Sequence, residues 1–215
     1  MRSRKLWVFD LDNTLHDAVP HVFPHINRSM TDYLQEHLGL EREQADCLRK
    51  HYWEKYGATL CGLMRHHKTR PDHFLSRTHD FPELSKMVVY EPMLGRSLRA
   101  LKGRKIVFSN APLQYAVSVL KILGIMAFFD EVFTIEHSKY RPKPDRYGFF
   151  RIFRKMGLKP SSLIMVEDDP GNLRMAKRLG MGTVWVTASL HRPAYVDMNV
   201  SSIRALARRQ FSLYK

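Results

Sequence analysis

Cysteine is scarce in this sequence: Cys47 and Cys61 are the only two among its 215 residues. They form no spacing typical of a zinc site, and they do not indicate a disulfide framework. No apolar run reaches the roughly 18 residues that a membrane-spanning helix needs. The basic start, MRSRKLWVFD, has an apolar part too short for a signal peptide. We therefore expect a cytoplasmic protein with free thiols and no membrane partner.

Acidic side chains are also few, with 21 Asp and Glu against 35 Lys and Arg and a net charge of +14. The imbalance lies in residues 96–215, which hold 22 basic and eight acidic residues, whereas residues 16–95 hold ten and eleven. No basic run interleaved with aromatics and no zinc-finger spacing accompanies this charge. The charge thus favours weak attraction of anions over specific nucleic-acid binding, which we do not expect. A non-catalytic nucleic-acid-binding module remains the remote alternative.

Five short apolar runs predict the strands of an α/β protein. They are LWVFD (6–10), KIVFS (105–109), EVFTI (131–135), LIMVE (163–167) and TVWVT (183–187). Continuous apolar runs of this length are typical of strands buried on both faces. Helix-like stretches at 112–124, 146–157 and 172–180 alternate with them, and each ends at a glycine. The alternation predicts a parallel sheet with helices on both sides.

The interval between the first two strands has a different character. Apolar residues there recur at helical spacing, in two stripes formed by Ile26, Met30, Tyr33, Leu34 and Leu38 and by Ala45, Leu48 and Tyr52. We therefore predict a core made of residues 1–15 and 96–215, with a helical domain, residues 16–95, inserted after the first strand. An insertion at the carboxyl edge of a parallel sheet is well placed to cover a ligand there.

Polar residues follow four of the predicted strands, and the carboxyl ends of parallel strands line one crevice. They are Asp10, Asp12, Asn13 and Thr14; Ser109 and Asn110; Lys143 within KYRPKPD; and Glu167, Asp168 and Asp169. Carboxylates without nearby His or Cys prefer a hard cation such as Mg²⁺, which often binds phosphate oxygens as well. Lys143 would add a compact positive charge for phosphate. The set predicts phosphoryl transfer, with one carboxylate as nucleophile and another as general acid and base.

The stretches DLDNTL, FSNA, RPKPD and VEDDPGN occur in that order and resemble motifs I to IV of the haloacid dehalogenase superfamily of phosphohydrolases. The resemblance spans nearly the whole chain. It implies a Rossmann-like three-layer α/β/α core with a parallel sheet, and a helical cap of the C1 type inserted after strand 1, as in subfamily I. True dehalogenases need no acid two residues after the nucleophile, so Asp12 favours phosphate chemistry.

The resemblance also implies roles for the catalytic residues. Asp10 resembles the nucleophile, and Asp12 resembles the general acid and base. Lys143 resembles the motif III lysine, which contacts the phosphate. Lys105 or Lys139 could take its place, an alternative that the sequence leaves open.

Other residues resemble the phosphate and metal ligands of the family. Asn13, Ser109 and Asn110, together with Lys143, would bind the substrate phosphate. Asp10, the backbone carbonyl of Asp12 and Asp168 would hold Mg²⁺, with Glu167 acting through water. Many members of the family have a small residue where this chain has Asp169. That residue is more typical of the acid at a helix N-terminus.

The segment HYWEKYGATLCGLMRHHKTRPDHF (51–74) resembles the cap of the pyrimidine 5′-nucleotidase branch. This implies UMP and CMP as substrates. Candidates to stack on a base or to read its edge, which could equally form the core of the cap, are Tyr52, Trp53, Tyr56, Arg65, His66 and His67. A phosphatase or mutase for sugar phosphates or phosphoglycolate is the alternative, because the fold does not select the substrate.

Overall fold

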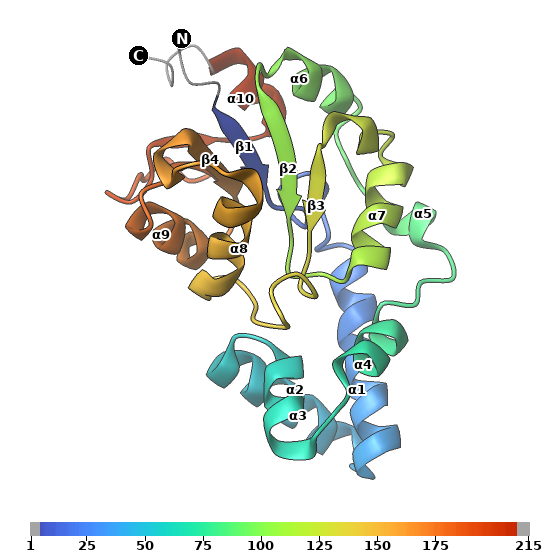
Figure 1. Ribbon diagram of the computed structural model, residues 1–215. Helices are drawn as coiled ribbons and strands as arrows, with labels where there is room; N and C mark the ends of the chain where they lie inside the picture. The colour runs from blue at the N-terminus through green and yellow to red at the C-terminus, as the bar shows by residue number, and fades with distance from the viewer. Residues whose placement is uncertain (1–4, 210–215) are drawn as a thin grey trace.

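The computed structural model describes residues 5–209 and contains one parallel six-stranded sheet (Figure 1). The strand order is β3-β2-β1-β4-β5-β6, with β1 at Leu6–Phe9, β2 at Arg104–Phe108, β3 at Glu131–Phe133, β4 at Leu163–Glu167, β5 at Gly182–Val186 and β6 at Met198–Val200. The α/β class is therefore confirmed. The edge strand β6 was not predicted, because its three residues, MNV, form no apolar run.

Ten helices surround the sheet and fill the interval between β1 and β2. They are α1 (Val22–Leu38), α2 (Arg42–Tyr56), α3 (Thr59–His67), α4 (Pro71–Thr78), α5 (Leu84–Met87), α6 (Leu94–Ala100), α7 (Leu113–Ile122), α8 (Arg146–Met156), α9 (Pro170–Arg178) and α10 (Ile203–Arg209) within the described residues. Two short 3-10 turns are at Met126–Phe128 and Pro160–Ser162. Among these residues no helix is long and apolar enough to cross a bilayer.

Side chains along a strand point alternately to the two faces of the sheet. In the central strands β1, β2 and β4 nearly every residue is buried, so both faces of the sheet are covered there. In β1, Trp7 and Phe9 belong to one hydrophobic cluster, with α6, α7 and α10, whereas Leu6 and Val8 belong to a second cluster, with α8 and α9. All four are fully buried. Figure 1 shows α8 and α9 on one side of the sheet and α7 on the other. This is the predicted three-layer α/β/α core.

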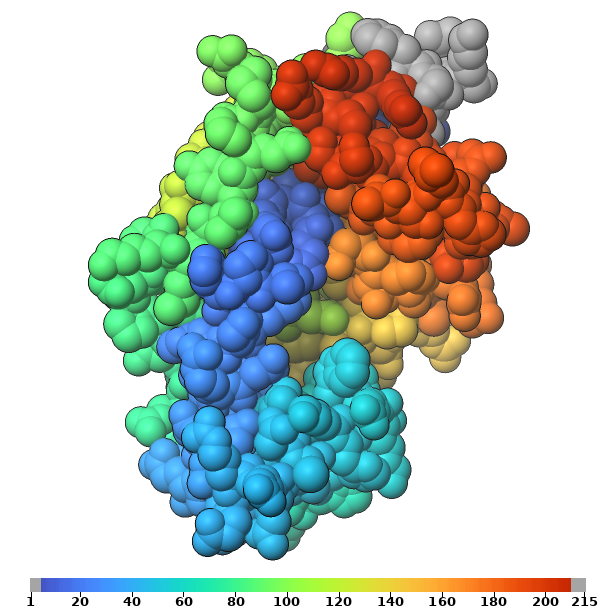
Figure 2. All heavy atoms as spheres, turned by 180° about the vertical axis from the view of Figure 1, so that it is seen from behind, coloured from blue at the N-terminus to red at the C-terminus, as the bar shows by residue number. Residues whose placement is uncertain are grey.

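Helices α1 to α4 enclose a third hydrophobic cluster, beyond the carboxyl ends of the strands (Figure 1). Both predicted stripes contribute to it, with Leu34 and Ala45 fully buried. Figure 2, the view from behind, shows the blue residues near the start of the chain continuing from the middle of the molecule into this helical part. Ala18 and Leu94 pack instead against the sheet. The division of the chain at residues 16 and 95 stays a prediction.

Candidate active site

Lys143 lies at the centre of a buried ionic cluster at the carboxyl edge of the sheet. Its Nζ donates hydrogen bonds to Asp10 Oδ1 at 2.6 Å, to Glu167 Oε2 at 2.8 Å and to the Phe108 carbonyl at 2.8 Å. Only 4 % of the lysine is exposed. An ammonium has three protons, so these three acceptors use its whole donor capacity. The cluster therefore joins groups at the carboxyl ends of β1, β2 and β4.

Burial alone would lower the pKa of Lys143, but attraction by Asp10 and Glu167 outweighs it and raises the pKa above its usual value. The lysine therefore stays charged. Burial, with Glu167 next in importance, raises the pKa of Asp10 to about 7. Burial likewise raises the pKa of Glu167 to about 7, although Lys143 opposes the shift. One lysine is too little positive charge for the carboxylates around it.

Asp168 completes a group of three carboxylates with Asp10 and Glu167, whose nearest oxygens all lie within 4.8 Å of one another. Burial and the Asp10 charge raise the pKa of Asp168. Three close carboxylates with only oxygen ligands fit a hard divalent cation, which would allow all of them to ionise. Both oxygens of Glu167 already accept hydrogen bonds, from Lys143 and Asn172 and from the amides of residues 168 and 169. Asp10 and Asp168 therefore have carboxylate oxygens that are less occupied by hydrogen bonds than those of Glu167, and these oxygens are better placed to bind a metal.

Ser109 and Asn110 follow β2 and lie beside the cluster. Ser109 is 1 % exposed, and its Oγ accepts a hydrogen bond from the Ala111 amide at 3.0 Å, which leaves its own proton to donate. The Asn110 side chain accepts from the Lys143 amide at 2.7 Å and donates to the Lys143 carbonyl at 3.2 Å. Asn110 therefore holds the backbone of the lysine loop. Its predicted contact with phosphate stays a prediction.

Asn13 occupies the turn after β1 with a left-handed backbone, φ +60°. Its Oδ1 accepts a hydrogen bond from the Ala18 amide at 3.1 Å, and its side chain also bonds to Asp168, which partly opposes the rise that burial causes in the pKa of that acid. Asparagine is one of the few residues that tolerate this conformation. The observed contacts of Asn13 thus shape the turn and orient Asp168, and phosphate binding by its side chain stays a prediction.

Asp12 has different surroundings from Asp10. Its Oδ1 accepts hydrogen bonds from Tyr115 Oη at 2.6 Å and from His16 Nε2 at 2.8 Å. Both partners are buried, at 2 % and 4 % exposure, and neither was predicted. His16 follows Asp12 by four residues and forms an isolated β-bridge with it, so its closeness in the sequence could have indicated the contact. Tyr115 carried none, because it lies on α7, 103 residues further along the chain.

Three alternatives that the sequence left open are resolved by position. Lys105 is at the opposite, amino end of β2, where its Nζ donates to the carbonyls of Leu101 and Gly103. Lys139 lies over the ring of Tyr147, outside the cluster. Asp169 is the N-cap of α9 and accepts a hydrogen bond from the Asn172 amide at 2.8 Å. Lys143 is thus the lysine in the site, and Asp169 caps a helix.

The candidate base-reading residues are largely engaged with one another. Tyr52 is 7 % exposed and its hydroxyl lies 2.9 Å from His67 Nε2, while the Tyr56 hydroxyl lies 2.6 Å from His66 Nε2. Arg65 lies over the ring of Tyr56. Trp53, in contrast, is 62 % exposed. Tyr52 therefore belongs to the core of the helical part, whereas the Trp53 ring faces solvent.

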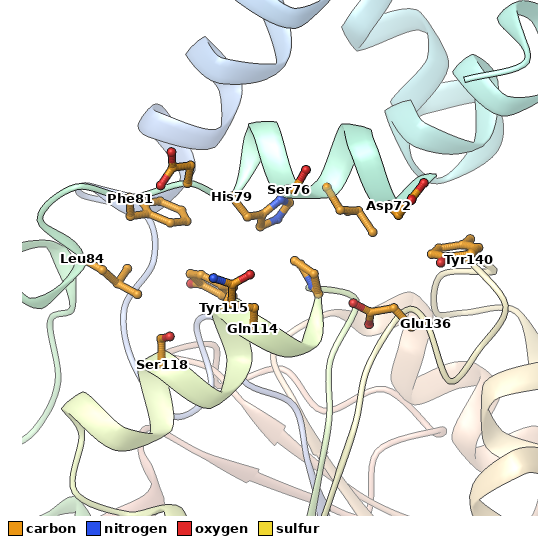
Figure 3. Close-up of a pocket in the computed structure, with 13 residues that line it drawn as sticks. Asp72, Ser76, His79, Phe81, Leu84, Gln114, Tyr115, Ser118, Glu136 and Tyr140 are labelled. Atoms are coloured by element: carbon orange, nitrogen blue, oxygen red, sulfur yellow. The ribbon is translucent and has the colours of Figure 1, made fainter. Parts of the chain in front are cut away.

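A cavity with a volume of about 450 Å³ lies between α4, α5 and α7 (Figure 3). Its lining includes the carboxylates Asp72, Asp80 and Glu136, and also the rings of His79, Phe81 and Tyr115. Asp10 and Lys143 do not line it. The Tyr115 ring therefore forms a wall between this cavity and Asp12.

Comparisons with known proteins agree with this geometry. Residues 5–180 match the family described as haloacid dehalogenase-like hydrolase. The chain is 26 % identical over 228 residues to Phosphate metabolism protein 8 of Saccharomyces cerevisiae, with 99 % of this chain and 70 % of the relative covered. It is 24 % identical over 199 residues to a phosphoglycolate phosphatase of Psychrobacter arcticus, with 85 % and 83 % covered.

A solved structure has the same fold. The crystal structure of a haloacid dehalogenase-type phosphatase from Thermococcus onnurineus superposes with a TM-score of 0.68 at 19 % identity, with 95 % of this chain and 96 % of that chain covered. The family match spans most of the sheet and all the residues of the ionic cluster. The chain therefore belongs to the family of haloacid dehalogenase-like hydrolases.

Proposed function

We propose that the protein is a Mg²⁺-dependent phosphomonoester hydrolase that acts through an aspartyl-phosphate on Asp10. The observation that carries this proposal is the contrast between its first two carboxylates. Asp10 is bonded to Lys143 inside the acidic cluster, whereas Asp12 is bonded to Tyr115 and His16 outside it. Two carboxylates in unlike environments are suited to two roles, nucleophile and proton donor.

The reaction follows from these positions. An Asp10 oxygen attacks phosphorus, the bond from phosphorus to the ester oxygen breaks, and Asp12 protonates the departing oxygen. A water molecule then gives its proton to Asp12 and attacks the acyl phosphate, which releases inorganic phosphate and restores Asp10. Lys143 neutralises Asp10 and is placed to attract the phosphoryl group, and the Ser109 hydroxyl can donate to a phosphoryl oxygen.

Asp10 and Asp168 are the side chains with oxygens available to hold the metal, with Glu167 beside them. When bound, Mg²⁺ supplies positive charge that offsets the developing negative charge of the transferring group. The role of the Asp12 backbone carbonyl as a metal ligand stays a prediction.

For the substrate, we propose a pyrimidine nucleoside 5′-monophosphate. The resemblance of residues 51–74 to nucleotidase caps supports this. Cys61 Sγ lies 3.6 Å from the Tyr140 carbonyl, so this segment is next to the loop that leads to Lys143. The alternative is phosphoglycolate, the substrate named for the Psychrobacter relative, or a sugar phosphate.

The test is phosphate release from a panel of esters in the presence of Mg²⁺: UMP, CMP, dTMP, AMP, GMP, phosphoglycolate, glucose phosphates and p-nitrophenyl phosphate. We expect UMP and CMP to be hydrolysed fastest, and chelation to stop all turnover until Mg²⁺ is restored. Asp10→Asn should lower kcat by at least roughly a thousandfold, because it removes the nucleophile.

Preference for phosphoglycolate or glucose phosphates would leave the reaction standing and discard the nucleotide. Near-wild-type turnover by Asp10→Asn, with the fold intact by circular dichroism, would refute the nucleophile. If no phosphate is released from any ester, the hydrolase is refuted and a binding role for the basic surface is favoured.

A further inference from the structure

The Asp12 carboxylate is held by one oxygen. Tyr115 Oη and His16 Nε2 both bond to Oδ1, at 2.6 and 2.8 Å, and the described residues donate no hydrogen bond to Oδ2. The two donors come from separate parts of the core, because Tyr115 lies on α7 and His16 lies in the turn after β1. Two bonds on one oxygen restrict rotation of the carboxyl group and leave the other oxygen available to a substrate.

The protons can be assigned from the partners. Both bonds meet Oδ1, and a carboxyl oxygen that bears no proton can only accept, so His16 donates through Nε2–H when Oδ2 carries the proton as well as when it does not. Its Nδ1 is buried and has no partner within residues 5–209, so a second ring proton there would be an unsatisfied donor. The neutral tautomer protonated at Nε2 therefore fits the site. Burial and the Asp12 charge raise the pKa of Tyr115 far above its usual range, so its hydroxyl also remains a donor.

Tyr115 is itself supported from the helical side. Its ring centroid lies 5.3 Å from that of Phe81 and 5.7 Å from that of His79, which both follow α4. Figure 3 shows these three rings together at the cavity between α4 and α7. The hydroxyl that bonds Asp12 is therefore carried by helix α7, and its ring packs against the segment that follows α4.

We propose that Tyr115 and His16 are positioning residues that hold the Asp12 carboxyl by Oδ1 and direct Oδ2 toward the ester oxygen of the substrate. This inference rests on the proposed function, in which Asp12 protonates that oxygen. Proton transfer depends steeply on the distance and alignment of the donor. Loss of either hydrogen bond should thus slow the step in which Asp12 protonates the leaving oxygen, without weakening the binding of phosphate.

Protonation of the departing ester oxygen by Asp12 matters only when that oxygen belongs to a poor leaving group. An alkyl oxygen, such as the 5′-oxygen of UMP, must be protonated as it departs, whereas p-nitrophenolate leaves readily without a proton. A defect in the position of Asp12 should therefore slow transfer of the phosphoryl group to Asp10, which kcat/KM reports, more for an alkyl ester than for p-nitrophenyl phosphate. A general loss of structure should slow both esters equally, so their ratio separates the two explanations.

The experiment compares kcat/KM for p-nitrophenyl phosphate with kcat/KM for the alkyl ester of the panel that the wild-type enzyme hydrolyses fastest. We expect Tyr115→Phe to lower kcat/KM on the alkyl ester about tenfold, which corresponds to one hydrogen bond to a charged group. We expect its kcat/KM on p-nitrophenyl phosphate to fall by less than about threefold, because that value excludes the later hydrolysis of the aspartyl-phosphate, which both esters share.

Three further variants serve as controls. His16→Gln keeps a donor near the place of Nε2 and should retain more of the alkyl-ester rate than His16→Leu, which has none. Tyr33→Phe removes another buried tyrosine hydroxyl, bonded to His73 Nδ1 at 3.0 Å in the helical part, and should leave the ratio of the two rates unchanged.

Equal losses of kcat/KM on both esters in Tyr115→Phe, or no loss on either, would overturn the positioning role. A ratio in His16→Gln no better than in His16→Leu would overturn it for His16. If the wild-type enzyme hydrolyses neither kind of ester, the proposed function fails first and this inference fails with it.

Discussion

At the scale of the residue, charge balance governs this site. Lys143 is buried between Asp10 and Glu167, and its ammonium is the one cation that the described residues bring into hydrogen bonds with these two acids. A buried charge is tolerated only when it is paired and hydrogen-bonded, so each member of the cluster depends on the others. Burial is the main cause that raises the pKa of Asp10 and of Glu167 to about 7, and attraction by Lys143 opposes it only in part. One lysine among three close carboxylates leaves the site suited to a cation.

Lys143→Met tests this dependence. We expect the variant to lose about 3–5 kcal/mol of unfolding free energy at neutral pH, because two buried carboxylates lose their cation. Its kcat on p-nitrophenyl phosphate should fall at least about a hundredfold, since the phosphoryl group loses the same charge. Urea unfolding and steady-state kinetics measure the two effects.

Lys105→Met is the matched control, because Lys105 is a buried lysine at the other end of the same sheet. Its Nζ bonds two backbone carbonyls and no acid. We expect a cost of about 1–3 kcal/mol in stability and no change in kcat. Similar kinetic losses in the two variants would contradict the assignment of Lys143 to the site.

At the scale of the element, the helical part depends on the close packing of α2 against α3. Gly62 on α3 faces the Tyr52 ring on α2, and a Cβ at Gly62 would lie 2.2 Å from Tyr52 Cγ. No side chain fits at this distance, so the glycine is required by packing and not by its backbone conformation. The contact fixes Tyr52 in the core of the helical part and leaves Trp53, the next residue, to face outward.

Gly62→Ala should therefore destabilise the protein by about 1–3 kcal/mol through overpacking. Gly95→Ala on α6 is the control, because its new Cβ would meet Phe128 Cε2 at an ordinary 3.8 Å. That variant should be neutral or stabilising by up to about 1 kcal/mol, as alanine favours a helix over glycine. Thermal and urea unfolding of both variants check the sign, and a stable Gly62→Ala would show that α2 and α3 can separate at little cost.

At the scale of the whole molecule, the boundary between the helical part and the sheet contains a titratable group. His79 follows α4 and contacts Tyr115 on α7. Burial lowers the pKa of His79 to about 4, attraction by Asp12 and Glu136 opposes the shift, and His25 adds to it. The histidine is therefore neutral in the folded protein at neutral pH and joins the two parts through its ring.

Stability should consequently depend on pH through His79. In the unfolded chain its pKa is about 6.5, so between pH 6.5 and about 4 the unfolded state binds more protons than the folded state. Stability attributable to His79 is present above pH 6.5 and falls as the pH drops through this window. We expect the wild type to lose about 1–3 kcal/mol more than His79→Gln between about pH 7.5 and about pH 4.5.

Urea unfolding of the two proteins at both pH values measures the difference. Other acids, including Asp10 and Glu167, titrate alike in the two proteins and cancel. Parallel losses of stability would contradict a histidine that is held neutral at this boundary.

Much of the fold follows from local sequence. Five of the six strands were predicted from their apolar runs, because a strand buried on both faces needs continuous apolar residues. Their parallel order then brings Asp10, Lys143 and Asp168 to one edge without further information. Strand β6 and helix α10 carry no such signal and were not predicted.

The chemistry within the site was divided between sequence and tertiary structure. The sequence alone determined which residues stand at the strand ends, since strand pattern and motif order are local properties. Tertiary structure alone decided that Tyr115 bonds Asp12, that Asn110 holds the Lys143 backbone and that Lys105 points away from the site. A hydrogen bond needs its two atoms within about 3 Å, and for residues far apart in the chain only the packing of the helices on the sheet sets that distance.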